Sequence, residues 1–172
     1  RGLLFIAMAG THQIWVLDLA SGRIAPFAGS GSEALADGSC AEAAFAQPQG
    51  LAIDAASNRL WVADSETSAI REIDLARGIV STLLGHGLFD FGDLDGMAEI
   101  ARLQHPMGVA WRPSDPAGPS LLVADTYNHR VKRLDLARKV VTSWAGAGAP
   151  DGCVDGEPQT ARFSEPMGIA IG

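Results

Sequence analysis

Carboxylate side chains gather in three stretches of the sequence, residues 29–48, 85–106 and 146–166. These stretches hold eleven acidic residues against two arginines, a balance of −9 in a chain whose net charge is −7. Hard cations such as Ca²⁺ bind carboxylate oxygens. The best candidates for such a site are Asp90, Asp93 and Asp95, but they do not have the spacing of an EF-hand loop. An Asp-Gly pair recurs in each stretch, which favours turns over a metal site. The acids are Glu33, Asp37, Glu42, the trio Asp90, Asp93 and Asp95, then Glu99, Asp151, Asp155, Glu157 and Glu165.

Histidine could supply zinc ligands, but a catalytic zinc needs about three protein ligands that converge on one point. His12 and His129 occupy the same position in two copies of a repeat, and Ser68 takes that position in the copy between them. Equivalent turns in successive repeats lie apart in space. We therefore predict that both histidines belong to capped hairpin turns.

Other reactive residue types show no catalytic spacing. Cys40 and Cys153 form neither a metal-ligand nor a Cys-x-x-Cys pattern. The Gly-x-Gly stretches 29–31 and 146–148 do not open a helix after a parallel strand, so we interpret them as turns rather than phosphate loops. No nucleophile elbow or acid and base pair is present. The sequence predicts no catalytic, cofactor-binding or metal-binding residue in this chain, although it leaves the question of an enzyme open.

Three segments of the chain repeat, beginning near residues 4, 60 and 121. Each reaches an Asp-Leu pair eleven residues after its alanine, then a Gly-x-Gly and then an Asp-Gly. A Pro-x-Gly-apolar-Ala motif begins eleven residues after the aspartate of each Asp-Gly, at Pro48, Pro106 and Pro166. Such fixed offsets indicate one structural unit used three times.

Each repeat reads as four short strands, because its apolar stretches are brief and are separated by Gly, Pro, Asn or Asp. In the middle copy we predict strands at residues 50–54 (a), 60–64 (b), 69–75 (c) and 79–84 (d). Residues 125–129 form a tight turn between b and c of the third copy, where Asn128 tolerates left-handed geometry. Gly50, Gly108 and Gly168 fall on strand a, where backbones approach closely. All four tryptophans fall in strands, so we expect packing rather than a binding cage.

The predicted fold class is all-β, a β-propeller of four-stranded antiparallel blades. The chain starts on a strand b and stops after a strand a, which gives twelve strands, or about three blade-equivalents over residues 1–172. Propellers have about four to eight blades, so we expect a piece of a larger propeller rather than half of a ring that a second copy completes. Open blade edges would permit self-association.

Two motifs carry a family resemblance. Residues 63–66 and 124–131, with the Asp-Leu and Pro-x-Gly-apolar-Ala motifs, resemble NHL repeats. Residues 6–15, 27–31, 91–96 and 103–106 are similar to the NHL repeat-containing protein 2 family and its bacterial relatives. This resemblance covers nearly the whole chain and implies a thioredoxin-like domain ahead of a six-bladed propeller. It gives Cys40 and Cys153 no redox role, because thioredoxin-like cysteines would lie outside this chain.

Composition narrows the classes of partner. With 47% hydrophobic and 19% charged residues, the chain is typical of a folded protein rather than a disordered tail. Its acidic charge disfavours nucleic acid and anionic membranes, and no apolar run approaches the roughly 18 residues of a membrane span. We expect a cytoplasmic protein, because no signal peptide and no disulfide framework are visible.

The sequence therefore favours a noncatalytic interaction module with a protein partner. In a propeller the d-to-a connections and the b-to-c turns emerge on one face, and partners bind there by analogy. The alternative is a fragment of a metal-dependent hydrolase or lyase whose other blades supply further ligands. The candidate partner-binding residues are Asp93, Asp95, Glu99 and Arg130.

Overall fold

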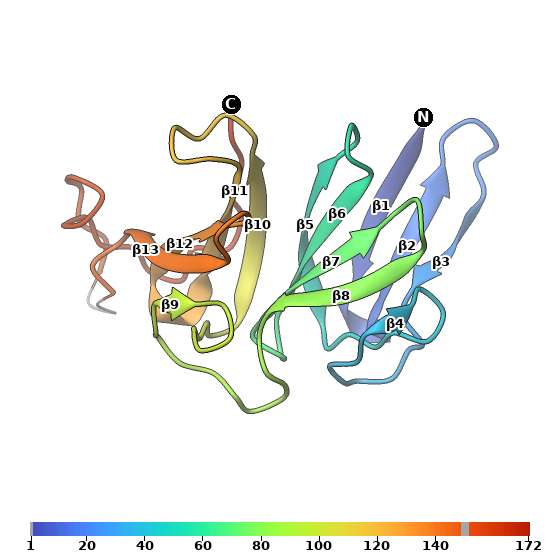
Figure 1. The fold of residues 1–172 in the computed structure, drawn as a ribbon, viewed down its shortest axis with the longest axis horizontal. Helices are drawn as coiled ribbons and strands as arrows, with labels where there is room; N and C mark the ends of the chain where they lie inside the picture. The colour runs from blue at the N-terminus through green and yellow to red at the C-terminus, as the bar shows by residue number, and fades with distance from the viewer. Residues whose placement is uncertain (1, 149–151) are drawn as a thin grey trace.

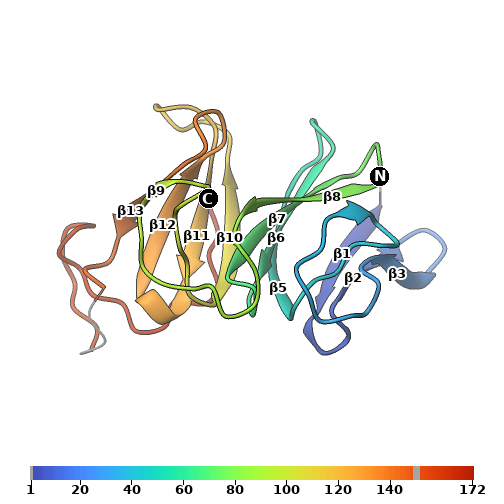
Figure 2. The same ribbon diagram turned by 60° about the horizontal axis from the view of Figure 1, so that its bottom comes forward.

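The computed structural model describes residues 2–148 and 152–172, and it contains three antiparallel sheets placed side by side. Both views show the third sheet beside the second and the second beside the first (Figures 1 and 2). The first sheet has the strand order β1-β2-β3. Its elements are β1 (Leu3–Met8), the 3₁₀ turn η1 (Ala9–Thr11), β2 (Gln13–Asp18) and β3 (Ile24–Ala28).

The second and third sheets each contain four long strands and one short strand, in the orders β5-β6-β7-β8-β4 and β10-β11-β12-β13-β9. The second sheet is built from β4 (Gly38–Ser39), β5 (Pro48–Asp54), β6 (Arg59–Asp64), β7 (Ala69–Asp74) and β8 (Ile79–Leu84). The third is built from β9 (Gly96–Met97), β10 (Pro106–Arg112), β11 (Ser120–Asp125), η2 (Thr126–Asn128), β12 (Arg130–Asp135) and β13 (Val140–Ala145). The predicted fold of four-stranded antiparallel blades is confirmed.

The structure differs from the sequence prediction at two places. A short fifth strand, β4 or β9, pairs with the outermost long strand of its blade, because the incoming connection folds back along that edge. Residues 166–170, predicted as a final strand a, are not in a strand. In the other two blades strand a pairs with strand b, and within the described chain no strand follows residue 165.

Apolar side chains pack between neighbouring sheets and hold the blades together. Between the first two blades, Phe45 and Ile14 are completely buried in a cluster that includes Ile73. Between the second and third blades, the rings of Trp61 and Trp111 lie 4.7 Å apart. All four tryptophans lie in strands, as predicted.

The innermost strands approach each other at glycine, as predicted for two of the three positions. A Cβ atom added at Gly50 would lie 2.8 Å from the Cα atom of Gly108, and one added at Gly108 would lie 2.2 Å from the carbonyl oxygen of Met167. Neither position has room for a side chain. Gly168 faces open space, because no strand lies against it within the described residues.

Candidate functional site

The d-to-a connections begin and end beside the b-to-c turns, and we call these connections and turns together the loop face. The middle of the first two connections runs back along the outer strand, where the N–H groups of Cys40 and Ala98 donate to the carbonyls of Gly78 and Lys139 in the c-to-d turns, both at 2.8 Å. Its connections are residues 29–47, 85–105 and 146–165, and its turns are residues 9–12, 65–68 and 126–129. Backbone N–H groups of Ala46 and Gln104 donate to the carboxylates of Asp64 and Asp125, both at 2.7 Å, so each connection is tied to the turn of its own blade. The connection between β8 and β9 runs along the lower edge of Figure 1.

A second set of hydrogen bonds joins each turn to the next blade. Nδ1 of His12 accepts from the N–H of Gln47 at 3.2 Å, and Nδ1 of His129 accepts from the N–H of Glu165 at 3.1 Å. In the middle copy Oγ of Ser68 accepts from the N–H of His105 at 3.2 Å. Both histidines lie in the turns, as predicted, because the N–H groups of His12 and His129 donate to the carbonyls of Ala9 and Thr126 and close the two 3₁₀ turns.

The left-handed residue of each turn differs from our expectation. It is His12, Ser68 or His129, with φ between 48° and 55°, and not Asn128. The Asn128 amide instead donates to the Asp125 carboxylate and to the carbonyl of Gly92, both at 2.7 Å. Asn128 is therefore held by its side chain, which leaves the next residue to reverse the chain.

The recurring Asp-Gly does more than form a turn. Asp37 accepts from the N–H and the hydroxyl of Thr82, at 3.0 and 2.8 Å, and Asp95 accepts from the N–H of Ser143 at 2.7 Å. The glycine that follows each aspartate begins the short strand β4 or β9. The Asp-Gly pairs at 37–38 and 95–96 therefore hold the connection against the outer strand of the following blade.

The second blade holds a buried arginine at the base of its connection. Arg71 is completely buried and donates to the carbonyls of Ala44 and Ala36, both at 2.8 Å. It also pairs with Asp64 at 3.3 Å and with Asp37 at 2.9 Å. Burial raises the pKa of Asp64 to about 6, although the Arg71 charge opposes that rise.

Lysine takes the same position in the third blade. Lys132, 1% exposed, binds the carboxylates of Asp93 and Asp95, the latter at 2.8 Å. Arg130 Nε lies 2.9 Å from Asp93 Oδ2. The structure thus brings together three of the four predicted partner-binding residues. Burial also raises the pKa of Asp125 to about 7.

Glu99, the fourth predicted residue, lies apart from that group. Its exposed side chain lines a cleft of about 360 Å³ between the second and third blades, together with His86 and Lys139. Whether Glu99 or the other three residues contact a partner stays a prediction.

Sequence reasoning missed Arg71 and Lys132. Both stand eleven residues after the first leucine of their repeat, and the first copy has Trp15 there. That repeated basic residue was the available signal. With Arg130 they bring three positive charges to the loop face, and Glu66 of the turn 65–68 adds one negative charge, so the balance of −9 counted from the connections becomes −7.

Several acids of the loop face keep no internal partner. Among residues 2–148 and 152–172, the carboxylates of five exposed acids make no ion pair and accept no hydrogen bond, whereas that of Glu42 accepts one from the Ser39 hydroxyl at 2.7 Å. Asp151 lies outside the described residues. The face therefore stays acidic after its internal pairs are counted. The five are Glu33, Glu99, Asp155, Glu157 and Glu165.

Aromatic rings form a second feature of the loop face. The ring of His105 stacks on Tyr127 at 4.5 Å between centroids, and Phe91 lies 6.3 Å from His105. Glu66 places a carboxylate oxygen 3.5 Å from Nε2 of His105. These side chains come from two turns and one connection, so only the fold brings them together.

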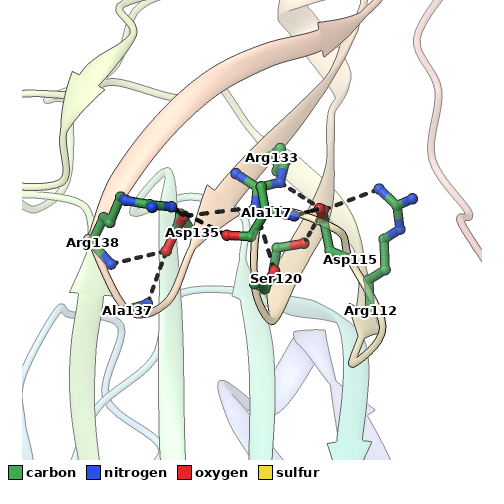
Figure 3. Close-up of polar contacts among 9 residues, drawn as sticks. Arg112, Asp115, Ala117, Ser120, Arg133, Asp135, Ala137 and Arg138 are labelled. Atoms are coloured by element: carbon green, nitrogen blue, oxygen red, sulfur yellow. Dashed lines mark hydrogen bonds and ion pairs between the residues drawn. The ribbon is translucent and has the colours of Figure 1, made fainter.

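The opposite end of the third blade carries a charge cluster with a structural role. Asp115 lies between Arg112 and Arg133, at 3.0 and 2.7 Å, and also accepts from the hydroxyl of Ser120 (Figure 3). These donors hold the pKa of Asp115 far below its usual range. They anchor residues 113–119, the longest a-to-b connection of the chain.

Beside it, Asp135 shows why each repeat contains an Asp-Leu pair. Its carboxylate accepts from the N–H groups of Ala137 and Arg138, at 3.0 and 2.9 Å (Figure 3). Asp18 and Asp74 accept in the same way from the residues two and three positions later. These hydrogen bonds close the c-to-d turns and lower the pKa of all three aspartates.

Over residues 2–148 and 152–172, no three His, Cys, Asp or Glu side chains are grouped so that they could hold a metal ion. In the same residues no helix has the length and apolar character needed to cross a membrane.

Comparison with known proteins identifies the repeat. Residues 45–73 match the NHL repeat. The chain is 41% identical to NHL repeat-containing protein 2 of Bos taurus and of Homo sapiens over 99% of its length, which is 26% of those proteins. It is 39% identical to the chloroplastic protein SUPPRESSOR OF QUENCHING 1 of Arabidopsis thaliana, over 98% of this chain and 16% of that protein.

Solved structures agree on the fold. An auxiliary nutrient binding protein from Bacteroides thetaiotaomicron matches 98% of this chain with a TM-score of 0.75 and 18% identity, over 40% of that protein. Its counterpart from Bacteroides ovatus matches the same shares with a TM-score of 0.72 and 19% identity. At this identity the likeness concerns the fold alone.

Proposed function

Because the chain is an NHL-repeat β-propeller segment related to NHL repeat-containing protein 2, we propose that it is a noncatalytic interaction module whose loop face binds a protein partner. The observation that carries this proposal is the repeated hydrogen bonding of the loop face. In each turn the polar side chains hold connections in place. The long connections therefore form a fixed surface, and fixed surfaces bind partners with little loss of conformational entropy.

Charge supports a protein rather than a nucleic acid as the partner. The loop face is acidic even after its internal ion pairs are counted. Binding to a phosphate backbone requires the opposite sign of charge. Basic surfaces of proteins are the complementary class.

The proposal places the chain in a longer, thioredoxin-like protein. Its support is the family resemblance of the sequence, together with the length of the relatives, of which the chain spans about a quarter. Any thiol chemistry would then belong to the other domain, and the propeller would contribute recognition.

The test reverses the charge of acidic residues of the loop face that make no ion pair within the described residues. Asp93 and Asp95 are unsuitable, because both already bind Lys132. In the full-length protein we would replace Glu33 and Glu99, both exposed, by lysine. The matched control replaces Arg23 and Arg77, exposed residues of c-to-d turns that lie outside the connections, by glutamate.

Affinity capture followed by quantitative mass spectrometry is the measurement. We expect E33K/E99K to capture at least about tenfold less of the specifically bound proteins, which corresponds to roughly 1.4 kcal/mol of binding free energy. The R23E/R77E protein should retain them. Equal capture by both variants, or loss only in the control, would show that the loop face is not the binding surface.

A further inference from the structure

The connection between β8 and β9 differs from its two counterparts. From the first glycine to the Asp-Gly aspartate it contains eleven residues, against nine and ten in the others, and only here does that stretch contain aromatic residues. Phe89 is 88% exposed and has a φ of 68°, in the left-handed region that favours glycine. Neither the exposure nor the backbone geometry of Phe89 helps the chain to fold. A phenylalanine held in this way is better explained by contact with another molecule.

Three other rings of the loop face lie close to one another. Phe91, 49% exposed, lies two residues further along and faces the His105 ring, which stacks on Tyr127, itself 44% exposed. We name Phe89, Phe91, His105 and Tyr127 the aromatic patch. Backbone hydrogen bonds hold its base, because Tyr127 N–H donates to the Gln104 carbonyl and His105 N–H donates to Ser68.

Negative charge borders the aromatic patch. Glu66 lies 3.5 Å from His105, and its side chain is 37% exposed. Aromatic faces attract cations, and a carboxylate beside them strengthens that attraction. The patch therefore combines two preferences, for apolar side chains and for positive charge.

We infer that the aromatic patch binds a peptide segment of the partner in which apolar residues alternate with arginine or lysine. Apolar side chains of the segment pack against Phe89 and Phe91, which have the exposed aromatic surface typical of binding hot spots. A basic side chain of the segment lies over the rings of Tyr127 and His105 and pairs with Glu66. This inference rests on the proposed function, because it names the class of partner for the same loop face.

The probe is a fluorescent ten-residue peptide of alternating leucine and arginine, measured by anisotropy with the full-length protein. Matched peptides of alternating leucine and glutamate, or of serine and arginine, test the two preferences separately. We expect the leucine-arginine peptide to bind, the serine-arginine peptide to bind more weakly, and the leucine-glutamate peptide not to bind. Equal binding of the two leucine peptides would contradict the role of charge and overturn the inference.

Substitutions locate the binding. F89S/F91S should lower the affinity for the leucine-arginine peptide at least about tenfold, as expected when hot-spot aromatic residues are removed. The control L19S/I24S removes two other exposed apolar residues, 61% and 54% exposed, from the first blade and should bind like the unmodified protein. E66Q should lower the affinity for this peptide less than F89S/F91S does, because it leaves the rings in place. Unchanged binding by F89S/F91S would overturn the inference.

Two further outcomes separate the alternatives. If phosphatidylcholine vesicles bind and F89S/F91S abolishes that binding, the patch is a membrane contact and the peptide inference is wrong. If F89S/F91S binds the peptide normally while E33K/E99K loses its captured proteins, the inference fails and the proposed function stands. Thermal melting of each variant, at values within a few degrees of the parent protein, shows that the binding losses do not reflect unfolding.

Discussion

The second and third blades solve the same problem with different chemistry. Each must hold a long connection against the end of its own strands, and each places a buried basic residue there. In the second blade Arg71 reaches two backbone carbonyls and two aspartates. In the third blade Lys132 reaches two aspartates of the connection, and Asp125 relies on the Asn128 amide.

The difference follows from the geometry of the two side chains. A guanidinium presents five donors in a planar fork, so one arginine can join several acceptors that lie in different directions. An ammonium group is a compact charge and joins fewer. In both blades the residue three positions after the buried aspartate also donates to it, Thr67 in the second blade and Asn128 in the third. Only Asn128 also donates to a carbonyl of the connection, that of Gly92, whereas in the second blade Arg71 reaches the carbonyls of the connection.

The largest expected effect comes from removing each cation. Arg71→Met leaves the fully buried carboxylate of Asp64 without its positively charged partner, so we expect the free energy of unfolding to fall by about 3 to 5 kcal/mol. Lys132→Met should cost less, about 2 kcal/mol, because water can reach Asp93 and Asp95, at 35% and 42% exposure. Urea unfolding of the full-length variants measures both. Equal losses would show that the two clusters are interchangeable.

The pH dependence of stability tests the third blade. The pKa of Asp125 is about 7 in the folded protein, against an ordinary value of 3.8, so the folded state binds more protons between these values. Stability contributed by this group is then present below about pH 4 and is lost as the pH rises to 7. We expect the free energy of unfolding to fall by about 4 kcal/mol over this window, because the two pKa values differ by about three units and each unit corresponds to about 1.4 kcal/mol.

Asp125→Asn removes the titrating group and serves as the control. Its introduced amide faces the Asn128 amide, so the variant starts less stable, but its curve between pH 4 and 7 should be flatter. An identical slope in the variant would assign the pH dependence to other residues.

Exchanging the two cations sharpens the comparison. We expect Arg71→Lys to lower stability by about 2 kcal/mol, because a lysine cannot serve the carbonyls of Ala36 and Ala44 as well as both aspartates. Lys132→Arg should change stability by less than about 1 kcal/mol, since its partly exposed aspartates can shift. Thermal unfolding compares the pair. A similar loss from both exchanges would mean that side-chain volume, not hydrogen bonding, decides.

The smallest effect concerns the part that both blades share. Asp37→Asn and Asp95→Asn keep an oxygen for the N–H groups of Thr82 and Ser143 but lose the charge opposite the cation. We expect each to cost about 1 kcal/mol. Amide hydrogen exchange should accelerate locally, at Thr82 in one variant and at Ser143 in the other. Acceleration spread over the whole blade would contradict a local clasp.

Much of the fold was predictable from residue spacing. The repeat offsets and the short apolar stretches predicted the four-stranded blades, the position of the tryptophans in strands and the close backbone approach at Gly50 and Gly108. The fifth strand was not predictable, because β4 and β9 have two residues each and exist only by pairing with a strand about 40 residues later in the chain. The prediction of a final strand at residues 166–170 was wrong, because the apolar residues are present but no strand that could pair with them is among the described residues.

The candidate site was predictable only in part. Counting charges along the connections identified an acidic face and included Asp93 and Asp95. It overlooked the strand residues Arg71 and Lys132, whose side chains reach that face. The aromatic patch was also missed, because Phe91, His105 and Tyr127 come from different segments of the chain.

The sequence by itself determined the unit and its number, because strand length, turn residues and motif offsets are local properties that repeat with the chain. Only the tertiary structure decided which charges were already neutralised and which rings met. Those outcomes depend on distances between segments that the blades bring together, and no local pattern encodes such distances.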